Sequence, residues 1–516
     1  MSELPEGWEI VPLPDCVYFQ EGPGLRKWQF GETGIPFLNI RTFNNGTIDK
    51  TKCQFVKIED FTGKYEHFLL NEGDIVVSSS GTLGKLAVVR EQDLPLMLNT
   101  SVIRYRTSYP EHLLQSYLKS YLQSQHFFRQ IESAKTGSAI FNYGPSHLKQ
   151  MKIVVAPPAE QRRIVAKLEK LLGKVEACQQ RLAKVPVILK RFRQAVLAAA
   201  CSGRLTESWR AKDFHSESSE ASSLNSLQAE IQRKVIEAEG DYNEPPESWR
   251  WISLDALCIK ITDGEHLTPP LSQTGIPLLS AKDVRENYLD FSDTKYVNTE
   301  VAAKSRSRCN PERGDILVVS RGATVGRTCR VQIDDVFCLM GSVLLFKPKA
   351  ELVRPQIIEY CFKSPTGLMN LIARSGSTAQ QAIYIRDMKS FPLPLPPKPE
   401  QQEIVRRVEA FFKLADQLEA RYQTAKAQVD KLTGSILAKA FRGELVPTEA
   451  ELARRECRDY ESAAALLERI NAAKTAKTER AGRTGQEPKA SRPKRQPARK
   501  QPAETAPARN RKLFDE

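Results

Sequence analysis

Residues 157–169 read PPAEQRRIVAKLE, and residues 396–409 read PPKPEQQEIVRRVE. In both stretches a proline-rich segment is followed by Glu-Gln and then by the first apolar residues of a long periodic pattern. Proline is tolerated in the first turn of a helix but breaks a helix interior, so each stretch marks the start of a helix. The similarity of these two sequences, about 240 residues apart, also indicates an internal duplication.

After each of these starts, apolar residues recur in alternating steps of four and three for about 40 residues. The first copy has Ile164, Leu168, Leu171, Val175, Cys178, Leu182, Val185, Leu189, Phe192 and Val196. The second copy has Ile404, Val408, Phe411, Ala415, Leu418, Tyr422, Ala425, Val429, Leu432 and Ile436, each 240 residues later. A 3.5-residue spacing kept over so many positions predicts the seam of a coiled coil.

Proline makes the two helices differ. Pro186 lies inside the first helix, where the second helix has Lys426. A proline in a helix interior removes one hydrogen bond and costs about 3 kcal/mol or more if the helix stays straight. We therefore expect a kink or short break near Val185 in the first copy only. Gly203 and Gly443 follow the two patterns as plausible helix caps.

The duplication extends over most of the chain. EGWEIVPLPD at 6–15 matches ESWRWISLDA at 247–256, and GIPFLNI at 34–40 matches GIPLLSA at 275–281. Further along, EGDIVVSSSG at 72–81 matches RGDILVVSRG at 313–322, and AVLAAACSGRL at 195–205 matches SILAKAFRGEL at 435–445. The chain therefore contains two copies of one module, and each copy has a first part followed by a long helix.

The first part of each module combines short β-branched runs with helical stretches. In the first copy, residues 35–40, 74–80, 85–90 and 101–106 have the composition of strands, and 111–131 has the spacing of one helix. Each first part is therefore expected to be a compact α/β domain. The expected divisions are domains at 1–157 and 244–396, helical regions at 158–211 and 397–446, a linker with a short helix at 212–243, a helical segment at 447–470 and a basic, disordered tail at 471–516.

Charge and composition limit the function classes. The net charge is +14, but residues 471–516 hold 13 Lys and Arg against 5 Asp and Glu, which leaves only +6 for the rest of the chain. That excess alone is a weak indication of nucleic-acid binding. No apolar stretch is long enough to span a membrane, and the start of the sequence does not resemble a secretion signal. The ten cysteines show no metal-ligand spacing, so we expect reduced thiols in a cytoplasmic protein.

Two α/β domains that alternate with two helices of the P-x-x-EQ-x-x-IV type resemble the specificity subunit of type I restriction-modification systems. LKRFRQAVL at 189–197, SILAKAFRGEL at 435–445 and SAAALLERI at 462–470 are most similar to the type IA branch. The resemblance implies an α/β (α+β) fold with an internal pseudo-two-fold repeat. Two target-recognition domains would be separated by two long helices that form an antiparallel coiled coil. A helix of 40 residues is about 60 Å long, so the coiled coil would act as a ruler.

The same resemblance implies the function and the partners. The chain would bind an asymmetric, bipartite double-stranded DNA sequence without catalysing any reaction itself. Two modification subunits would use S-adenosylmethionine to methylate adenine, and motor-nuclease restriction subunits would consume ATP with Mg²⁺. No cofactor or metal is expected in this chain. The GRL and GEL segments resemble the family's contacts with the methyltransferase, although a plain helix cap explains Gly203 and Gly443 equally well.

DNA contacts are expected from polar and basic side chains in loops, because Arg or Lys can bind guanine, Asn or Gln can bind adenine, and Ser more often binds phosphate. In the first domain the candidates are Arg41, Ser79, Ser80, Lys85, Asn99, Thr136, Ser138, Asn142 and Tyr143. In the second domain they are Lys282, Ser320, Arg321, Arg327, Ser342, Ser377, Gln380 and Tyr384. For any single one of them, a solvated or turn-capping side chain is the competing interpretation.

Two other functions stay open at this point. A coiled-coil scaffold with duplicated protein-binding domains would have the same heptads, and sequence-selective DNA binding that needs both domains distinguishes the two. A self-contained methyltransferase or nuclease would need catalytic motifs. The sequence has no N-P-P-Y or D-P-P-Y, no phosphate-binding loop and no H-E-x-x-H.

Overall fold

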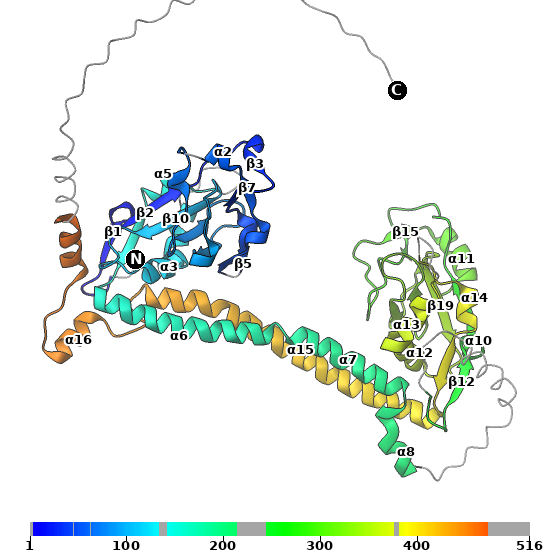
Figure 1. Cartoon of the computed structure of the whole chain (residues 1–516). Coiled ribbons are helices and arrows are strands. Elements are labelled where there is room, and N and C mark those ends of the chain that lie inside the picture. The colour runs from blue at the N-terminus through cyan, green and yellow to red at the C-terminus, as the bar shows by residue number, and fades with distance from the viewer. Residues whose placement is uncertain are drawn as a thin grey trace, which may run out of the picture. The chain divides into compact units, whose positions relative to one another are not determined.

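The computed structural model describes residues 4–44, 46–61, 63–133, 142–213, 244–375 and 381–472. It divides into two compact units, which we call unit 1 (residues 1–173 and 433–516) and unit 2 (residues 174–432). Most of the expected linker at 212–243 and nearly all of the expected tail at 471–516 lie outside the described residues. Each unit contains one globular domain and parts of both long helices (Figure 1).

The main sheet of unit 1 has four antiparallel strands in the order β2-β10-β8-β9. These are β2 (Val17–Glu21), β10 (Val102–Thr107), β8 (Ile75–Ser78) and β9 (Leu86–Val88). Successive side chains of a strand point to opposite faces of the sheet. Ile75 and Ile103 pack in one apolar cluster, while Val76 and Val102 pack in another, so both faces are covered.

Smaller elements surround this sheet. β1 (Glu9–Pro12) pairs with β11 (Lys152–Val155). A three-stranded sheet has the order β3 (Phe30–Gly31), β7 (Gln54–Val56) and β4 (Ile35–Phe37). β5 (Phe43–Asn44) pairs with β6 (Thr47–Ile48). The short helices of unit 1 are α1 (Leu13–Cys16), α2 (Ile58–Phe61), α5 (Pro145–Leu148) and α16 (Glu449–Glu456).

The single helix expected at 111–131 is wrong. The structure has two helices, α3 (Gln115–Leu122) and α4 (Gln125–Ser133), with a break at Ser124. The Ser124 hydroxyl donates to the Tyr121 carbonyl at 2.7 Å and accepts the Phe127 N–H at 3.4 Å. Serine side chains compete with helical hydrogen bonds in this way and cap a new helix instead.

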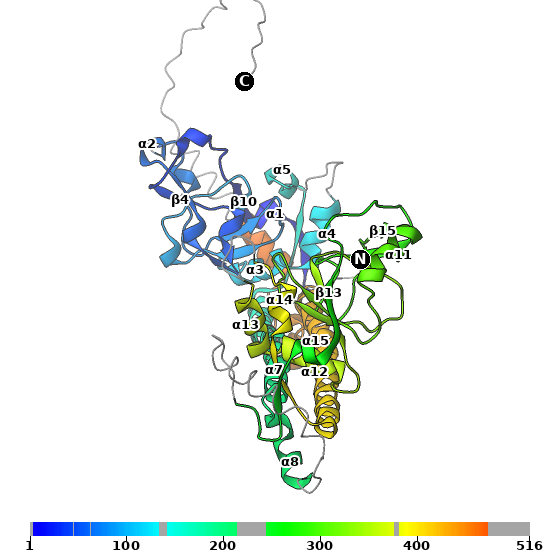
Figure 2. The ribbon, with the colours of Figure 1, turned by 90° about the vertical axis from the view of Figure 1, so that its right-hand side faces the viewer.

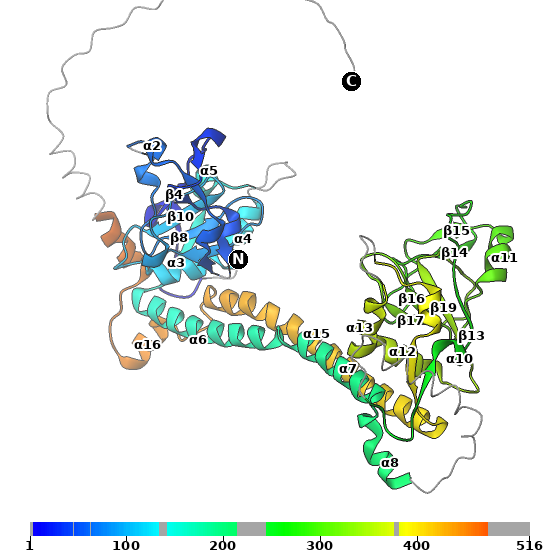
Figure 3. The same ribbon diagram turned by 45° about the vertical axis from the view of Figure 1, so that its right-hand side comes forward.

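Unit 2 repeats this arrangement. Its main sheet has the order β13-β19-β16-β17, and α12 lies against it (Figure 3). The strands are β13 (Cys258–Asp263), β19 (Val343–Pro348), β16 (Ile316–Val319) and β17 (Thr328–Arg330). The smaller sheets are β12 (Arg250–Ser253) with β20 (Pro392–Leu395), and β15 (Lys295–Val297), β14 (Ile276–Leu279) and β18 (Cys338–Leu339). Its helices outside the long pair are α8 (Glu207–Asp213), α10 (Leu254–Leu257), α11 (Thr299–Arg308), α12 (Pro355–Lys363), α13 (Pro365–Ala373) and α14 (Ile385–Lys389).

The long helices differ at the expected proline. The first copy is broken into α6 (Pro158–Leu182) and α7 (Val185–Cys201), and Pro186 lies in the first turn of α7. The second copy is one continuous helix, α15 (Lys398–Ala440). A proline in a first turn loses no intrahelical hydrogen bond, because that N–H has no helical partner. The break near Val185 is therefore confirmed.

In unit 2, α7 and α15 run antiparallel. Phe192 packs edge-on against Phe411 with 6.0 Å between ring centroids, and Arg193 pairs with Asp416 at 2.7 Å. Further along α7, Val196 shares an apolar cluster with Val408, and α7 also lies against α12 (Figure 2). Residues further along α7 therefore contact residues that are earlier in α15, as in an antiparallel coiled coil.

The seam is not closed along its whole length. Its buried members are Ile164, Leu168, Val175, Leu189, Val196, Ile404, Val408 and Ala415. Its half-buried members are Leu171, Leu182, Val185, Phe192, Tyr422, Ala425, Val429 and Ile436. Cys178, Phe411, Leu418 and Leu432 are exposed, with 41% of Leu418 accessible to solvent. The seam is buried where a globular domain also packs on it, as at Val196 and Val408, and regular spacing alone did not predict which positions these are.

The Glu-Gln pair explains why each helix starts where it does. Gln161 accepts the Leu114 N–H at 3.0 Å and donates to the Ala156 carbonyl at 2.9 Å. Gln401 repeats this with the Arg354 N–H at 2.8 Å and the Pro396 carbonyl at 3.0 Å. Both glutamines are buried, so their hydrogen bonds satisfy backbone groups that water does not reach. Each amide therefore fixes a long helix to its own globular domain.

The glutamate of each pair binds the tryptophan at the start of its own module and a segment that follows the other long helix. Glu160 Oε1 accepts the Trp8 indole N–H at 3.1 Å, and Glu160 Oε2 accepts the backbone N–H of Glu449 at 2.8 Å. Glu449 follows the second long helix, not the first. Unit 1 is thus completed by residues from the far end of the chain.

Unit 2 has the corresponding arrangement. Glu400 Oε2 accepts the Trp249 indole N–H at 2.8 Å, and Glu400 Oε1 accepts the Thr206 hydroxyl at 2.6 Å and an N–H of Arg210. Gly203 has φ of +78°, and an added Cβ would lie 2.3 Å from Pro246 Cγ. Gly443 has φ of +75° and the same 2.3 Å approach to Pro5. Gly203 and Gly443 therefore adopt the left-handed conformation that favours glycine, and the absence of a side chain lets Pro246 and Pro5 pack against them.

Candidate nucleic-acid interface

In unit 1, four backbone segments meet at one end of the main sheet. The Ser79 N–H donates to the Ser101 carbonyl at 2.9 Å, and the Ser79 carbonyl accepts the Tyr143 N–H at 3.1 Å. Ser80 forms a β-bridge with Asn142. At the same end, an added Cβ on Gly22 would lie 2.5 Å from the Asn99 backbone. The turns after β2 and β8, the turn before β10 and the segment before α5 thus form one continuous surface.

This surface brings together several of the candidates from the sequence. Arg41, Lys85 and Asn142 are exposed, and Ser80 is half-buried. Ser79 and Tyr143 are buried, so they do not meet the condition of exposure on which they were chosen. The reason is that residues 142–144 lie across Ser79 as an additional strand. Thr136 and Ser138 lie outside the described residues.

The side chain of Asn99 makes hydrogen bonds within its own turn. Its side-chain oxygen accepts the Ser101 N–H at 2.9 Å and the Thr100 hydroxyl at 3.1 Å. These are the contacts of an Asx turn, in which the side chain shapes the turn before β10. The Asn99 side-chain oxygen therefore positions the turn, and contact of Asn99 with DNA stays a prediction.

Unit 2 has the same backbone arrangement with different side chains. The Ser320 N–H donates to the Ser342 carbonyl at 2.9 Å, and its carbonyl accepts the Ile383 N–H at 2.8 Å. The β-bridge here joins Arg321 to Ala382, where unit 1 has Ser80 and Asn142. Arg321 is exposed, whereas Ser320 is buried beneath the bridge like Ser79.

The other candidates of unit 2 have partners within the unit. Arg327 donates to the Val284 carbonyl at 3.2 Å, and the Ser342 hydroxyl accepts the Ala281 N–H at 3.1 Å. Lys282 pairs with Asp293 at 2.7 Å, and this hydrogen bond raises the pKa of the exposed lysine. Tyr384 is 47% exposed, and the Arg386 guanidinium lies 5.5 Å from its ring centroid. Ser377 and Gln380 lie outside the described residues.

Acidic groups at this end of each sheet were missed in the sequence. Glu21 pairs in register with Ile103, and Asp263 pairs with Leu344 at the corresponding place. Burial raises the pKa of Glu21. Asp263 pairs with Arg308 at 2.5 Å and with His266 at 3.2 Å. A carboxylate can accept from the exocyclic amine of cytosine, so the half-buried Glu21 belongs to the candidate surface, whereas Asp263 is buried and paired within unit 2. The duplication could have indicated them, because both precede an aligned glycine.

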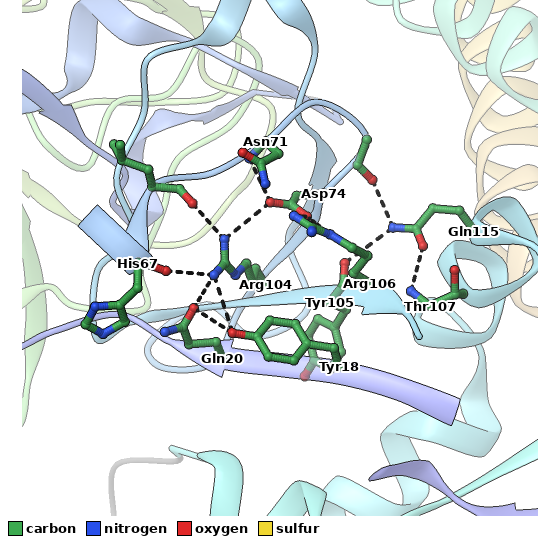
Figure 4. A network of polar contacts seen from close by, with 12 residues as sticks. Tyr18, Gln20, His67, Asn71, Asp74, Arg104, Tyr105, Arg106, Thr107 and Gln115 are labelled. Atoms are coloured by element: carbon green, nitrogen blue, oxygen red, sulfur yellow. Dashed lines mark hydrogen bonds and ion pairs between the residues drawn. The ribbon is translucent and has the colours of Figure 1, made fainter. Parts of the chain in front are cut away.

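A polar network holds the opposite end of the unit 1 sheet (Figure 4). Asp74 is fully buried, accepts the Asn71 N–H at 2.8 Å, and pairs with Arg106 at 2.6 Å and Arg104 at 3.6 Å. Arg104 also donates to the carbonyls of Leu69 at 2.7 Å and His67 at 2.8 Å. Every one of these contacts is internal. The network therefore fixes β8 to β10 and supports the loops without being part of their surface.

Neither unit shows a metal centre in its described part. Among the described residues, no group of three or more His, Cys, Asp or Glu side chains is placed to hold a metal ion. Within the same residues, no helix has the length and apolar character needed to cross a bilayer. The two surfaces offer exposed hydrogen-bonding side chains, such as Asn142 and Arg321, at one end of each main sheet.

Comparisons with known proteins agree with this organisation. A family model described as "Type I restriction modification DNA specificity domain" matches residues 5–187 and 270–426. The EcoKI specificity subunit of Escherichia coli strain K12 is 30% identical over 494 residues, covering 92% of this chain and 97% of that protein. The StySPI specificity subunit of Salmonella potsdam is 28% identical over 480 residues, covering 91% and 96%.

Solved structures show the same fold. A chain from a study of assembly and conformational transition in the type I R-M system has a TM-score of 0.62 at 19% identity, covering 86% of this chain and all of that one. The HsdS subunit from Thermoanaerobacter tengcongensis has a TM-score of 0.51 at 19% identity, covering 86% and 98%.

Proposed function

Because this chain belongs to the family of type I restriction-modification specificity subunits, we propose that it reads an asymmetric, bipartite DNA sequence, with one half-site bound by each unit. The observation that carries the proposal is the pair of equivalent surfaces with different side chains. Unit 1 has Ser80 and Asn142 at the β-bridge, and unit 2 has Arg321 and Ala382. Asn pairs well with adenine and Arg with guanine, so the two surfaces should select different bases.

The chemistry is proposed to belong to partner subunits. Two modification subunits would use S-adenosylmethionine to methylate adenine at the bound site, and motor-nuclease subunits would use ATP and Mg²⁺ for restriction. The recognised adenine would have to leave the base stack, which is a step for the methyltransferase. This chain would contribute only the choice of sequence.

Exposed apolar residues on the long helices support docking of such partners. Val187 and Ile188 on α7 are 52% and 59% exposed, and Leu414 on α15 is 46% exposed. Leu418, one turn after Leu414, extends the apolar stripe along α15. Apolar side chains that recur on one helix face typically bind another helix. We propose that helices of the modification subunits cover this stripe.

The test of the proposed function is adenine methylation mapping of DNA from cells that express this chain with and without a matching modification subunit. The expected result is a new split, asymmetric motif that appears only when both proteins are present. If a soluble complex forms and no new motif appears, the chain is a scaffold rather than a recognition subunit.

Arg321→Ala is expected to weaken specific DNA binding by the complex about 10- to 100-fold, because a lost bidentate contact to guanine costs about 1–3 kcal/mol. Discrimination at one position of one half-site should be lost as well. The measurement is competition binding with DNA duplexes that vary one base pair at a time.

Arg313→Ala is the matched control, because Arg313 and Arg321 lie at opposite ends of the same strand β16. Arg313 pairs with Asp334 at 2.7 Å, away from the candidate surface. Equal losses of affinity for the two variants would contradict the assignment of the reading surface to the end of the sheet that carries Arg321.

A further inference from the structure

Unit 1 has a cavity of about 460 Å³ that the recognition surface does not use. It lies between α4, the paired strands β1 and β11, and the last turn of α15. The apolar part of its lining consists of Leu4, Pro5, Ile10, Tyr121, Val154 and Phe441. Its volume is within the range of about 300–1,000 Å³ that ligand pockets typically have. A cavity this large with an apolar lining is suited to bulky apolar side chains.

The polar part of the lining contains three cationic side chains, together with Gln125, Gln130 and His126. Arg129, Lys152 and Arg442 line the cavity and are exposed, and His126 is half-buried beside them. Burial, together with Arg129 and Arg442, lowers the pKa of His126. Arg442 pairs with Glu444 at 2.7 Å, which offsets its positive charge. The remaining cations favour an occupant that carries carboxylates next to its apolar side chains.

We propose that residues 513–516 of this same chain, Leu-Phe-Asp-Glu, occupy the cavity. Leu513 and Phe514 are the only large apolar side chains between residues 473 and 516. Asp515 and Glu516 follow them directly and supply two carboxylates for the cationic rim. The segment thus combines the two chemical properties that the cavity requires.

The length of the intervening chain allows this contact. The helical residues 463–472 pack into unit 1 through Ala463, Leu466 and Ile470, in the same apolar cluster as Tyr121 and Phe441 of the cavity. From residue 472 to residue 513 a fully extended chain spans about 130–150 Å, and a flexible coil has a mean end-to-end distance of about 35 Å. Tethering through a chain of this length would give an effective concentration on the order of millimolar, so a weak contact is sufficient.

Docking would change the role of the basic stretch. With residues 513–516 bound, the Lys- and Arg-rich residues between 474 and 512 would form a loop held at both ends on unit 1. The positive charge of this loop would then stay close to unit 1 instead of extending away from it.

The test measures fluorescence anisotropy of a labelled peptide of residues 510–516 with two full-length proteins, the wild-type chain and the L513A/F514A variant. In the variant the cavity is free, whereas in the wild-type chain the tethered segment competes with the peptide. We expect the variant to bind the peptide at least about 10-fold more tightly than wild type, in keeping with the effective concentration of a tethered segment.

Two further measurements identify the site and the chemistry. Adding R129E to the L513A/F514A protein should weaken binding at least about 5-fold, since a cation at the rim is replaced by an anion. Lys170→Glu, on the exposed face of α6, is the matched control and should leave binding unchanged. A peptide with Asn and Gln in place of Asp515 and Glu516 should also bind more weakly.

Equal binding of the peptide to wild type and L513A/F514A would overturn the proposal and point to another occupant, such as residues 1–3 or a partner subunit. Binding that is insensitive to Arg129→Glu would overturn it as well, because the peptide would then bind elsewhere.

Discussion

Asp74→Ala is expected to lower the free energy of unfolding of unit 1 by about 3–5 kcal/mol, the range observed when one partner of a buried ion pair is removed. Asp74 is fully buried and pairs with both Arg104 and Arg106. Arg104 is itself 6% exposed, so its charge would stay in the interior without the compensating carboxylate. The loss should be measured by hydrogen exchange of peptides from β8 and β10, because exchange reports on each unit separately.

Glu6→Ala is the control for Asp74→Ala within the same unit. Glu6 pairs with Arg454 at 3.0 Å, and both side chains are well exposed. Solvent-exposed ion pairs contribute at most about 1 kcal/mol. If the two variants destabilise unit 1 equally, the buried network of Figure 4 contributes no more to the stability of the sheet than an exposed ion pair does.

Glu400→Ala is expected to destabilise unit 2 by about 3–5 kcal/mol, because it removes the only carboxylate between three donors. The Trp249 indole, the Thr206 hydroxyl and the Arg210 guanidinium all donate to Glu400, which is 1% exposed. The variant should also release residues 203–213 from the base of the domain. Faster exchange of that segment, measured together with the loss of global stability, would report both effects.

The control for Glu400→Ala is Glu419→Ala, on the same helix and in the same unit. Glu419 pairs with Arg193 at 2.9 Å and is 49% exposed, so the expected loss is at most about 1 kcal/mol. A large destabilisation by Glu419→Ala, or none by Glu400→Ala, would contradict the view that the Glu-Gln pair fixes the helix start to the domain.

The large features of the fold followed from periodicity, which depends on local sequence alone. The heptads located α6, α7 and α15, and Pro186 located the break between α6 and α7. The wrong prediction of one helix at 111–131 also had a local cause. The apolar spacing was given more weight than Ser124, which caps a new helix at this point. A serine between two glutamines in a helical pattern is a signal that could have been used.

The candidate surface was harder to predict, because its geometry depends on contacts between distant residues. Ser79 and Ser320 looked like loop residues, but segments about 60 residues later in the chain cover both of them. No periodic pattern encodes such a contact. For the same reason the sequence did not reveal that Glu160 binds the backbone of Glu449, 289 residues away.

The closure of unit 1 by residues after 433 has a consequence for synthesis on the ribosome. The globular domain that is translated first is completed last, because Glu160 must wait for the backbone N–H of Glu449. At about 5–20 residues per second, roughly 13–50 s separate translation of residues 173 and 433. Unit 2 has all of its residues before that time. A nascent chain would therefore hold a complete unit 2 while unit 1 still lacks the residues after 433.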